Sequence, residues 1–145
     1  MHIEYLEELR QLTNGRFDFS NWSAFNFVSA MELLFPAREG MVRKYSWAIP
    51  NEEALQTIAR YAPILEIGAG TGYWAYLLRQ MGVEVAALDL NPPREDSDCN
   101  PHHPFQSTWT HVRKPFGPGL AVYHKHALFL CWPPGPDPRL VSILR

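Results

Sequence analysis

Three glycines at alternate positions form the clearest chemical signal in the sequence. Gly68, Gly70 and Gly72 directly follow the short apolar run at residues 64–67. Glycine lets the main chain turn sharply and approach a ligand closely. A helix that begins just after such a loop points free N–H groups at that ligand. The loop therefore predicts a binding site for a nucleotide-like molecule at the end of a strand.

Two acidic residues frame this loop. Asp89 stands at the expected end of the next strand, where a carboxylate can accept hydrogen bonds from two ribose hydroxyls. Glu66 precedes Gly68, at a position where a carboxylate is unfavourable beside a pyrophosphate but suits a cationic amino group. A helix-capping or salt-bridged role is open for Glu66, and a turn beginning at Asp89 with Asn91 and Pro92 is the alternative there.

The spacing of the glycines separates two classes of ligand. Dinucleotide-binding loops have the pattern G-x-G-x-x-G, whereas here the third glycine comes one residue earlier. This disfavours a nucleotide-dependent oxidoreductase, which would bind NAD more tightly than S-adenosylmethionine (SAM). Together with Glu66, the spacing favours SAM, whose methionine end carries an amino group. A tight strand–helix turn without any ligand is the remaining alternative.

The stretch Leu65-Glu66-Ile67-Gly68-Ala69-Gly70-Thr71-Gly72 closely resembles motif I of the class I SAM-dependent methyltransferases. The resemblance implies a Rossmann-like α/β fold with a mostly parallel sheet, and S-adenosyl-L-methionine as the cofactor. It also implies which residues would bind SAM. These are Glu66, Gly68, Ala69, Gly70 and Gly72 for its amino-acid and ribose portions, and Asp89 with Leu90 for the ribose side.

Two further segments are similar to parts of the same family. Residues 45–50 resemble the segment that closes over SAM ahead of motif I, which implies cofactor contacts for Tyr45 and Trp47; packing roles are the alternative. The segment Cys131-Trp132-Pro133-Pro134 occupies the place of motif IV and implies a substrate pocket. This segment holds no carboxylate or carboxamide that would bind an amine, so the methyl acceptor and the catalytic residues stay open. A buried structural thiol is the alternative for Cys131.

The elements that would position these residues follow one another in a recognisable order. Amphipathic spacing predicts a helix over residues 3–12, an aromatic-rich helix over 21–35 and a third helix from Asn51 to about Tyr61. A strand at 64–67, a helix at 73–81 and a strand at 83–88 then form a βαβ unit. Prolines between 91 and 119 predict mostly loop, with a short strand near 109–112. Another strand is expected at 127–132, and one or two helical turns in the tail at 135–145.

This order predicts an N-terminal helical extension over residues 1–50 and a partial Rossmann-like domain over 51–145. The complete sheet of the methyltransferase family has seven strands, and this sequence reaches only the fourth. We therefore expect a truncated relative, or a sheet that a partner completes. An unpaired apolar sheet edge favours association, so an oligomer that covers the edge is expected.

The composition limits the remaining function classes. A net charge of −2 argues against an extended nucleic-acid or membrane-binding surface, and the acidic N-terminus does not resemble a signal peptide. The presence of only two cysteines favours a reducing, cytoplasmic (intracellular) location. The spacing of the histidines fits no zinc pattern, so no metal is expected. Two hypotheses remain for function: a SAM-dependent methyltransferase, and a non-catalytic SAM-binding or partner-binding module.

Overall fold

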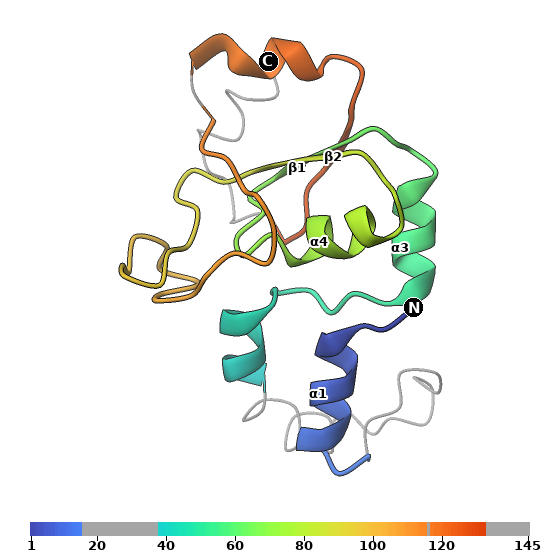
Figure 1. Ribbon diagram of the computed structural model, residues 1–145, viewed down its shortest axis with the longest axis vertical. Helices are drawn as coiled ribbons and strands as arrows, with labels where there is room; N and C mark the ends of the chain where they lie inside the picture. Colours follow the sequence, from blue (N-terminus) through green and yellow to red (C-terminus); the bar gives the residue numbers. More distant parts are fainter. Residues whose placement is uncertain (16–37, 116, 133–145) are drawn as a thin grey trace.

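The computed structural model describes residues 1–15, 38–115 and 117–132. In this part of the chain, three strands form one parallel sheet: β1 (Ile64–Ile67), β2 (Val85–Leu88) and β3 (Ala127–Phe129). Helices lie on both sides of the sheet (Figure 1). The expected α/β class with a parallel sheet is therefore confirmed. No helix in the described ranges has the length and apolar character needed to cross a membrane.

The central strand of the sheet is β1, and the order is β2-β1-β3. β1 pairs with β2 from Ile64↔Val85 to Ile67↔Leu88, and on its other side it pairs with β3. The chain thus leaves β1 toward one side and later returns to the other. The carboxyl end of β1 is a topological switch point, and open α/β sheets bind ligands in the crevice outside such a point.

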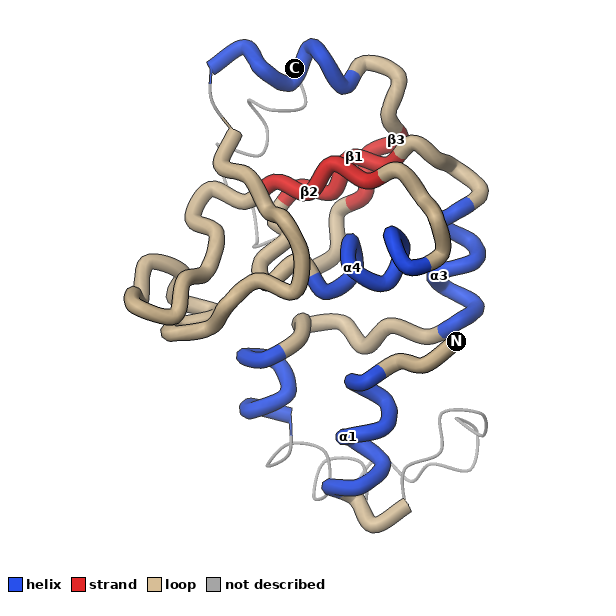
Figure 2. The backbone as a smooth tube through the Cα atoms, in the orientation of Figure 1, coloured by secondary structure: helices blue, strands red, loops and turns tan. Residues whose placement is uncertain are grey.

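The helices form layers on either side of the sheet. α4 (Tyr73–Gln80) and α3 (Glu52–Ala59) lie on one side, and the 3-10 helix η2 (Gly117–Tyr123) lies on the opposite side (Figure 2). α1 (Glu4–Leu12) lies beyond α4, next to a further helical segment at residues 38–44. The helices expected at 3–12, 51–61 and 73–81 are confirmed. Those expected at 21–35 and 135–145 lie outside the described residues.

The local sequence explains where two of these helices begin and end. Asn51 caps α3, since its side-chain oxygen accepts the N–H of Ala54 at 2.8 Å. Gly82, with φ of +79°, ends the turn after α4. Val83 still donates its N–H to Leu78 of that helix, which is why β2 begins at Val85 rather than at the expected residue 83.

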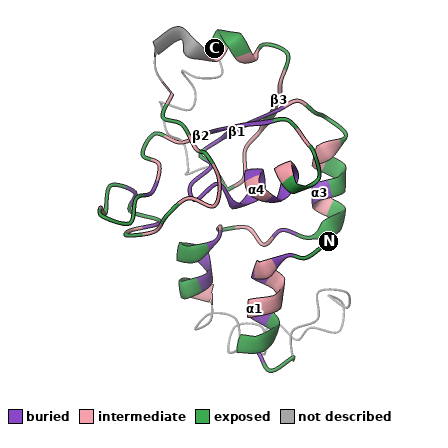
Figure 3. Cartoon of the chain, in the orientation of Figure 1, coloured by how far each residue is buried: buried purple, intermediate pink, exposed green. Residues whose placement is uncertain are grey.

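Each face of the sheet contributes to a separate apolar cluster. The larger cluster joins Ile64, Val85 and Ala87 to α4, α3 and α1, and Figure 3 shows β1, β2 and much of α4 as buried. The N-terminal helix α1 is part of this main core. The smaller cluster lies on the other face, where Leu65 and its neighbours contact side chains of η2.

An aromatic cluster packs α1 and the segment after residue 44 against α4. Its members are Tyr5, Tyr45, Tyr73, Tyr76 and Trp109. The ring centroids of Tyr45 and Trp109 are 5.1 Å apart in a stacked arrangement, and those of Tyr45 and Tyr73 are 4.8 Å apart. The Tyr73 hydroxyl accepts the N–H of Tyr5 at 3.0 Å and donates to Glu4 at 3.0 Å.

The strand expected near residues 109–112 is wrong. Trp109 instead donates its main-chain N–H to the carbonyl of Thr71 at 2.8 Å and its indole N–H to the carbonyl of Lys44 at 2.8 Å. The hydrogen bonds of Trp109 therefore go to the glycine loop and to the segment before Tyr45, and in the described residues a single parallel bridge, between Arg113 and Leu88, joins this segment to β2. β3 ends at Phe129 rather than at the expected residue 132, and the left-handed φ of +55° at Trp132 excludes that residue from a strand.

Candidate functional site

The structure brings the glycine loop and Asp89 together at the switch point. The N–H of Gly70 donates to Oδ2 of Asp89 at 2.8 Å, and the N–H of Asn91 donates to Oδ1 at 2.8 Å. The N–H groups of Gly68 and Ala69 both donate to the carbonyl of Leu88, at 2.9 and 3.0 Å. The start of the loop is thereby tied to the end of β2, and Asp89 is oriented by the backbone on both sides.

Asp89 keeps acceptor capacity after these two bonds. Each carboxylate oxygen has two lone-pair sites, and each accepts one hydrogen bond from the main chain. The residue is half-buried, and its neighbour Leu90 is exposed. A partly exposed carboxylate of fixed orientation, with lone pairs left over, can accept hydrogen bonds from a diol.

His103 lies directly against Gly70, a contact that the sequence did not indicate. A Cβ atom added to Gly70 would lie 2.6 Å from Nε2 of His103. The His103 side chain is only 4% exposed, and its Nδ1 lies 2.9 Å from the carbonyl of Arg43. Because a carbonyl only accepts, Nδ1 carries the proton; burial also lowers the pKa of the ring, which keeps it neutral. The bare Nε2 therefore faces Gly70.

Asn100 fixes the backbone on which His103 stands. Its side-chain oxygen accepts the N–H of His102 at 3.0 Å and that of His103 at 3.2 Å, and its Nδ2 donates to the carbonyl of Asn91. An asparagine followed by proline is a common turn signal, so the turn was visible in the sequence. The position of this turn over Gly70 depends on a long-range contact, so it could not be predicted from the sequence.

The three glycines have different surroundings. A Cβ at Gly72 would lie 2.6 Å from Cγ2 of Val112, whereas a Cβ at Gly68 would meet none of the described residues within 4 Å. The neighbouring Thr71 donates its hydroxyl to the carbonyl of Tyr45, and Ala69 is buried. Of the three glycines, only Gly68 leaves open space beside the main chain as far as the described residues extend.

Glu66 lies inside the protein rather than at its surface. Its side chain is 2% exposed, and Oε2 has no hydrogen-bond partner among residues 1–15, 38–115 and 117–132. Burial raises the pKa of this carboxyl to about 8, against the opposing effect of a backbone hydrogen bond from Ala75. Burial also raises the pKa of the nearby Cys131 thiol to about 12, and the charge of Glu66 acts in the same direction. A thiol with this pKa is a poor nucleophile, which agrees with a structural role for Cys131.

The other predicted residues lie in two places. Tyr45 is buried in the aromatic cluster, and its hydroxyl donates to Glu8 at 2.7 Å. Trp47 and Trp132 are exposed and lie close to each other, with ring centroids 6.3 Å apart. Cofactor contact by Tyr45 or Trp47 stays a prediction. Pro133 and Pro134 lie outside the described residues.

No family model, curated protein or solved structure matches this chain. Any conclusion about its function therefore rests on the geometry of the site and on the chemistry of its residues.

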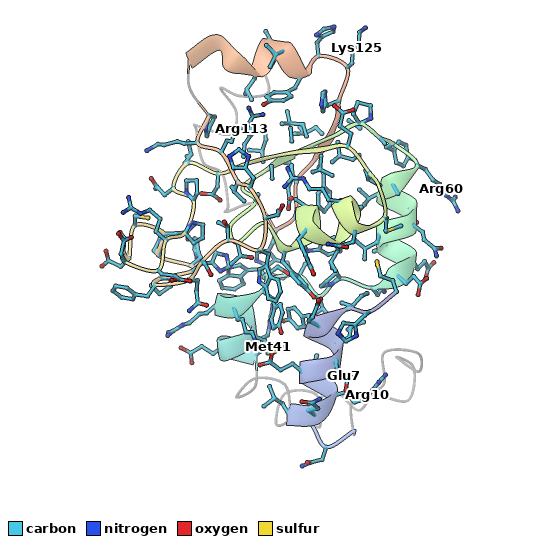
Figure 4. The ribbon with its side chains drawn as sticks, viewed as in Figure 1. Glu7, Arg10, Met41, Arg60, Arg113 and Lys125 are labelled. Carbon is cyan, nitrogen blue, oxygen red and sulfur yellow. The ribbon has the colours of Figure 1, made fainter. Side chains whose placement is uncertain are left out.

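A hollow lies on the η2 side of the sheet. Its volume is about 440 Å³, and Leu88, Arg113, Lys114, Leu120 and Tyr123 are among its lining residues. Arg113 lies between the sheet and η2 (Figure 4), where it donates to the Tyr123 hydroxyl. This hollow was not expected from the sequence. It lies beside the end of β2. Within the described residues, no group of three or more His, Cys, Asp or Glu side chains could hold a metal ion.

Proposed function

We propose that this chain binds SAM at the carboxyl end of β1, in the manner of a Rossmann-like methyltransferase, and that it is a SAM-dependent methyltransferase. The observation that carries the proposal is the 2.8 Å hydrogen bond from the Gly70 N–H to Asp89. It joins the glycine loop to an acid at the topological switch point, where open α/β sheets bind ligands. The composition of the loop and its resemblance to motif I add support.

The residues at this point fit the adenosine part of SAM. Asp89 has acceptor sites left for the two ribose hydroxyls, and Leu90 offers an exposed apolar surface beside it. Gly68 leaves open space beside the main chain. Glu66 is enclosed, and burial raises the pKa of its carboxyl to about 8, so at neutral pH it offers a cationic ligand neither a direct contact nor a full negative charge.

Bound SAM would supply an electrophilic methyl group. The protein would then have to align the methyl acceptor with SAM and exclude water. No acid–base pair is obligatory for such a displacement. The half-buried thiol of Cys131, with its raised pKa, is consistent with a site that contributes no nucleophile of its own. The expected substrate pocket, around Cys131 and Trp132, follows β3 and so lies at the same end of the sheet as the glycine loop.

A second candidate function is a non-catalytic SAM-binding or partner-binding module. The observation that favours it is the imidazole of His103, which fills the space over Gly70. A ligand that needs this space has to displace the turn at residues 100–103. A chain in which His103 stays over Gly70 would leave no room at that point for a methyl acceptor to meet a bound cofactor.

Isothermal titration calorimetry with SAM, S-adenosylhomocysteine and NAD tests the binding site. We expect the two adenosyl compounds to bind more tightly than NAD. Asp89→Ala should weaken SAM binding by about 1–3 kcal/mol, because the ribose hydroxyls lose their acceptor. Asp96→Ala is the matched control, since Asp96 is an exposed acid that pairs with Arg94 and should leave affinity unchanged. An unaltered affinity in the folded Asp89→Ala protein would remove Asp89 from the site.

Methyl transfer from radiolabelled SAM then separates the two candidate functions. Labelled product with any of a panel of acceptors supports the enzyme. Tight binding of SAM without transfer to any acceptor supports the non-catalytic module. Binding of NAD in preference to SAM contradicts both.

A further inference from the structure

Four side chains form an exposed aromatic and cationic cluster next to the glycine loop. We call this cluster the indole platform: Arg38, Trp47, His102 and Trp132. The rings of Trp47 and Trp132 are 17° from parallel with centroids 6.3 Å apart, and the His102 ring meets Trp47 edge-on at 5.7 Å. Arg38 donates to the carbonyl of Trp47 at 3.3 Å, and its guanidinium carbon lies 5.8 Å from the centre of the Trp132 ring.

The platform is at the surface and is not part of either core. Trp47 is 37% exposed and Trp132 is 61% exposed. By contrast, Trp109 and Trp74 contact the main apolar cluster. Two large indoles close together in water offer apolar ring surface that a ligand can cover.

The backbone at Trp132 supports a role beyond packing. Its φ of +55° lies in the left-handed region, which bulky residues rarely adopt. Such a conformation costs free energy and is found preferentially at functional sites, where the surrounding structure maintains it. This conformation occurs three residues after the end of β3, at the point where the indole of Trp132 meets that of Trp47.

The platform adjoins the proposed SAM site through two consecutive histidines. His102 contacts Trp47, while His103 lies against Gly70. Trp132 follows β3, and Asp89 follows β2, so they lie on opposite sides of the central strand β1. A ligand on the platform would therefore lie beside the glycine loop, on the side away from the acid that is proposed to bind the ribose.

We propose that the indole platform binds a planar aromatic ring that carries a carboxylate or phosphate, and that compounds of this class are the methyl acceptors. The second clause rests on the proposed function, whereas the first does not. Stacking on an exposed indole contributes favourable binding free energy for an aromatic ring. The guanidinium of Arg38 attracts an anionic substituent and repels a cationic one. The electron-rich indole faces alone would favour cations, so the charge preference depends on Arg38.

Calorimetric titration with three small probes tests this assignment without involving the adenosyl site. The probes are 2-naphthoate, 2-naphthylmethylammonium, which has the same ring system with the opposite charge, and cyclohexanecarboxylate, which has the charge without the aromatic ring. We expect only 2-naphthoate to bind. Stronger binding of the ammonium compound, or equal binding of the non-aromatic acid, would overturn the proposal.

Variants then locate the binding surface. Trp132→Ala should weaken naphthoate binding roughly fivefold or more, the scale measured for loss of one stacking aromatic, and Arg38→Gln should abolish the preference for the anion. The matched control is Phe105→Ala, because Phe105 is also 61% exposed but is not part of the platform. Equal loss in Phe105→Ala and Trp132→Ala would mean nonspecific binding and would overturn the assignment. Trp132→Gly tolerates the left-handed backbone and guards against misfolding of the alanine variant.

The same proteins also distinguish failure of this proposal from failure of the proposed function. If naphthoate binds the platform and SAM does not bind the wild-type chain, the platform stands and the proposed function fails. If SAM binds and naphthoate does not, the platform fails alone. If both bind, methylation of aromatic carboxylates or phosphates should exceed that of the non-aromatic acid, and equal rates would overturn the assignment of the acceptor class.

Discussion

A side chain at residue 70 should destabilise the protein by a predictable amount. Gly70 has φ of +52°, a conformation that costs about 1–2 kcal/mol for a residue with a Cβ atom. Its Cβ would also lie 2.6 Å from Nε2 of His103, an overlap of the kind that typically costs about 1–3 kcal/mol. Gly70→Ala should therefore lower the free energy of unfolding by about 2–5 kcal/mol, the sum of these two ranges.

Gly68→Ala is the matched control for this substitution. Gly68 has a similar backbone conformation, with φ of +74°, but open space where the Cβ would stand. Only the backbone cost of about 1–2 kcal/mol should appear there. Urea unfolding followed by circular dichroism measures both variants.

A double-mutant cycle isolates the contact with His103. In a His103→Ala background the overlap is gone, so Gly70→Ala should cost no more than Gly68→Ala does in the wild-type chain. Equal costs for the two glycines in the wild-type background would refute the reasoning, as would full additivity of Gly70→Ala and His103→Ala. Either result would mean that the imidazole does not lie against Gly70.

Three further substitutions test the buried polar groups. Burial lowers the pKa of His103, so its stabilising contribution should be complete above about pH 6.5 and be lost as the pH falls through the lower folded-state pKa. In urea unfolding, the stability of His103→Asn should therefore differ less from that of the wild type at pH 5 than at pH 7.5. The pKa of Glu66 is shifted in the opposite direction, up to about 8. The wild-type chain should therefore lose stability relative to Glu66→Gln as the pH rises from 5 to 8. A stability difference that stays constant over this range would contradict the raised pKa. Tyr73→Phe should lower the free energy of unfolding by about 1–3 kcal/mol, because the N–H of Tyr5 loses its acceptor. Tyr76→Phe, at the edge of the same cluster, should lower it by less. Equal losses in denaturant unfolding would mean that the Tyr73 hydroxyl is not the acceptor.

The parts of the fold that depend on local signals could be predicted from the sequence. The βαβ order around the glycine loop follows from a short apolar run, a glycine turn and an amphipathic segment within 25 residues, 64–88. The start of α3 follows from one capping side chain, Asn51. Asp89 could be placed near the loop because parallel neighbouring strands end at the same edge of a sheet.

The contacts that fill the loop could not be predicted in this way. His103 reaches Gly70 from a proline-rich turn, and Trp109 reaches Thr71 from a segment whose pattern is equally typical of a strand. Both contacts join residues more than 30 positions apart, so no local periodicity encodes them. The position of Tyr45 in the aromatic cluster has the same origin, because its ring packs between α1 and the Trp109 segment.

The surroundings of the glycines weaken the glycine pattern as a sign of a bound ligand. Gly70 and Gly72 each make room for a side chain of the protein itself, His103 and Val112. Two of the three glycines therefore have a reason to be there that involves no cofactor. The features that favour ligand binding are instead the acid at the end of β2 and, within the described residues, the open space beside Gly68. A molecule that enters there lies between Asp89 and the indole platform, and it can extend over Gly70 only as His103 withdraws, so cofactor binding and movement of the turn at 100–103 should be a single event.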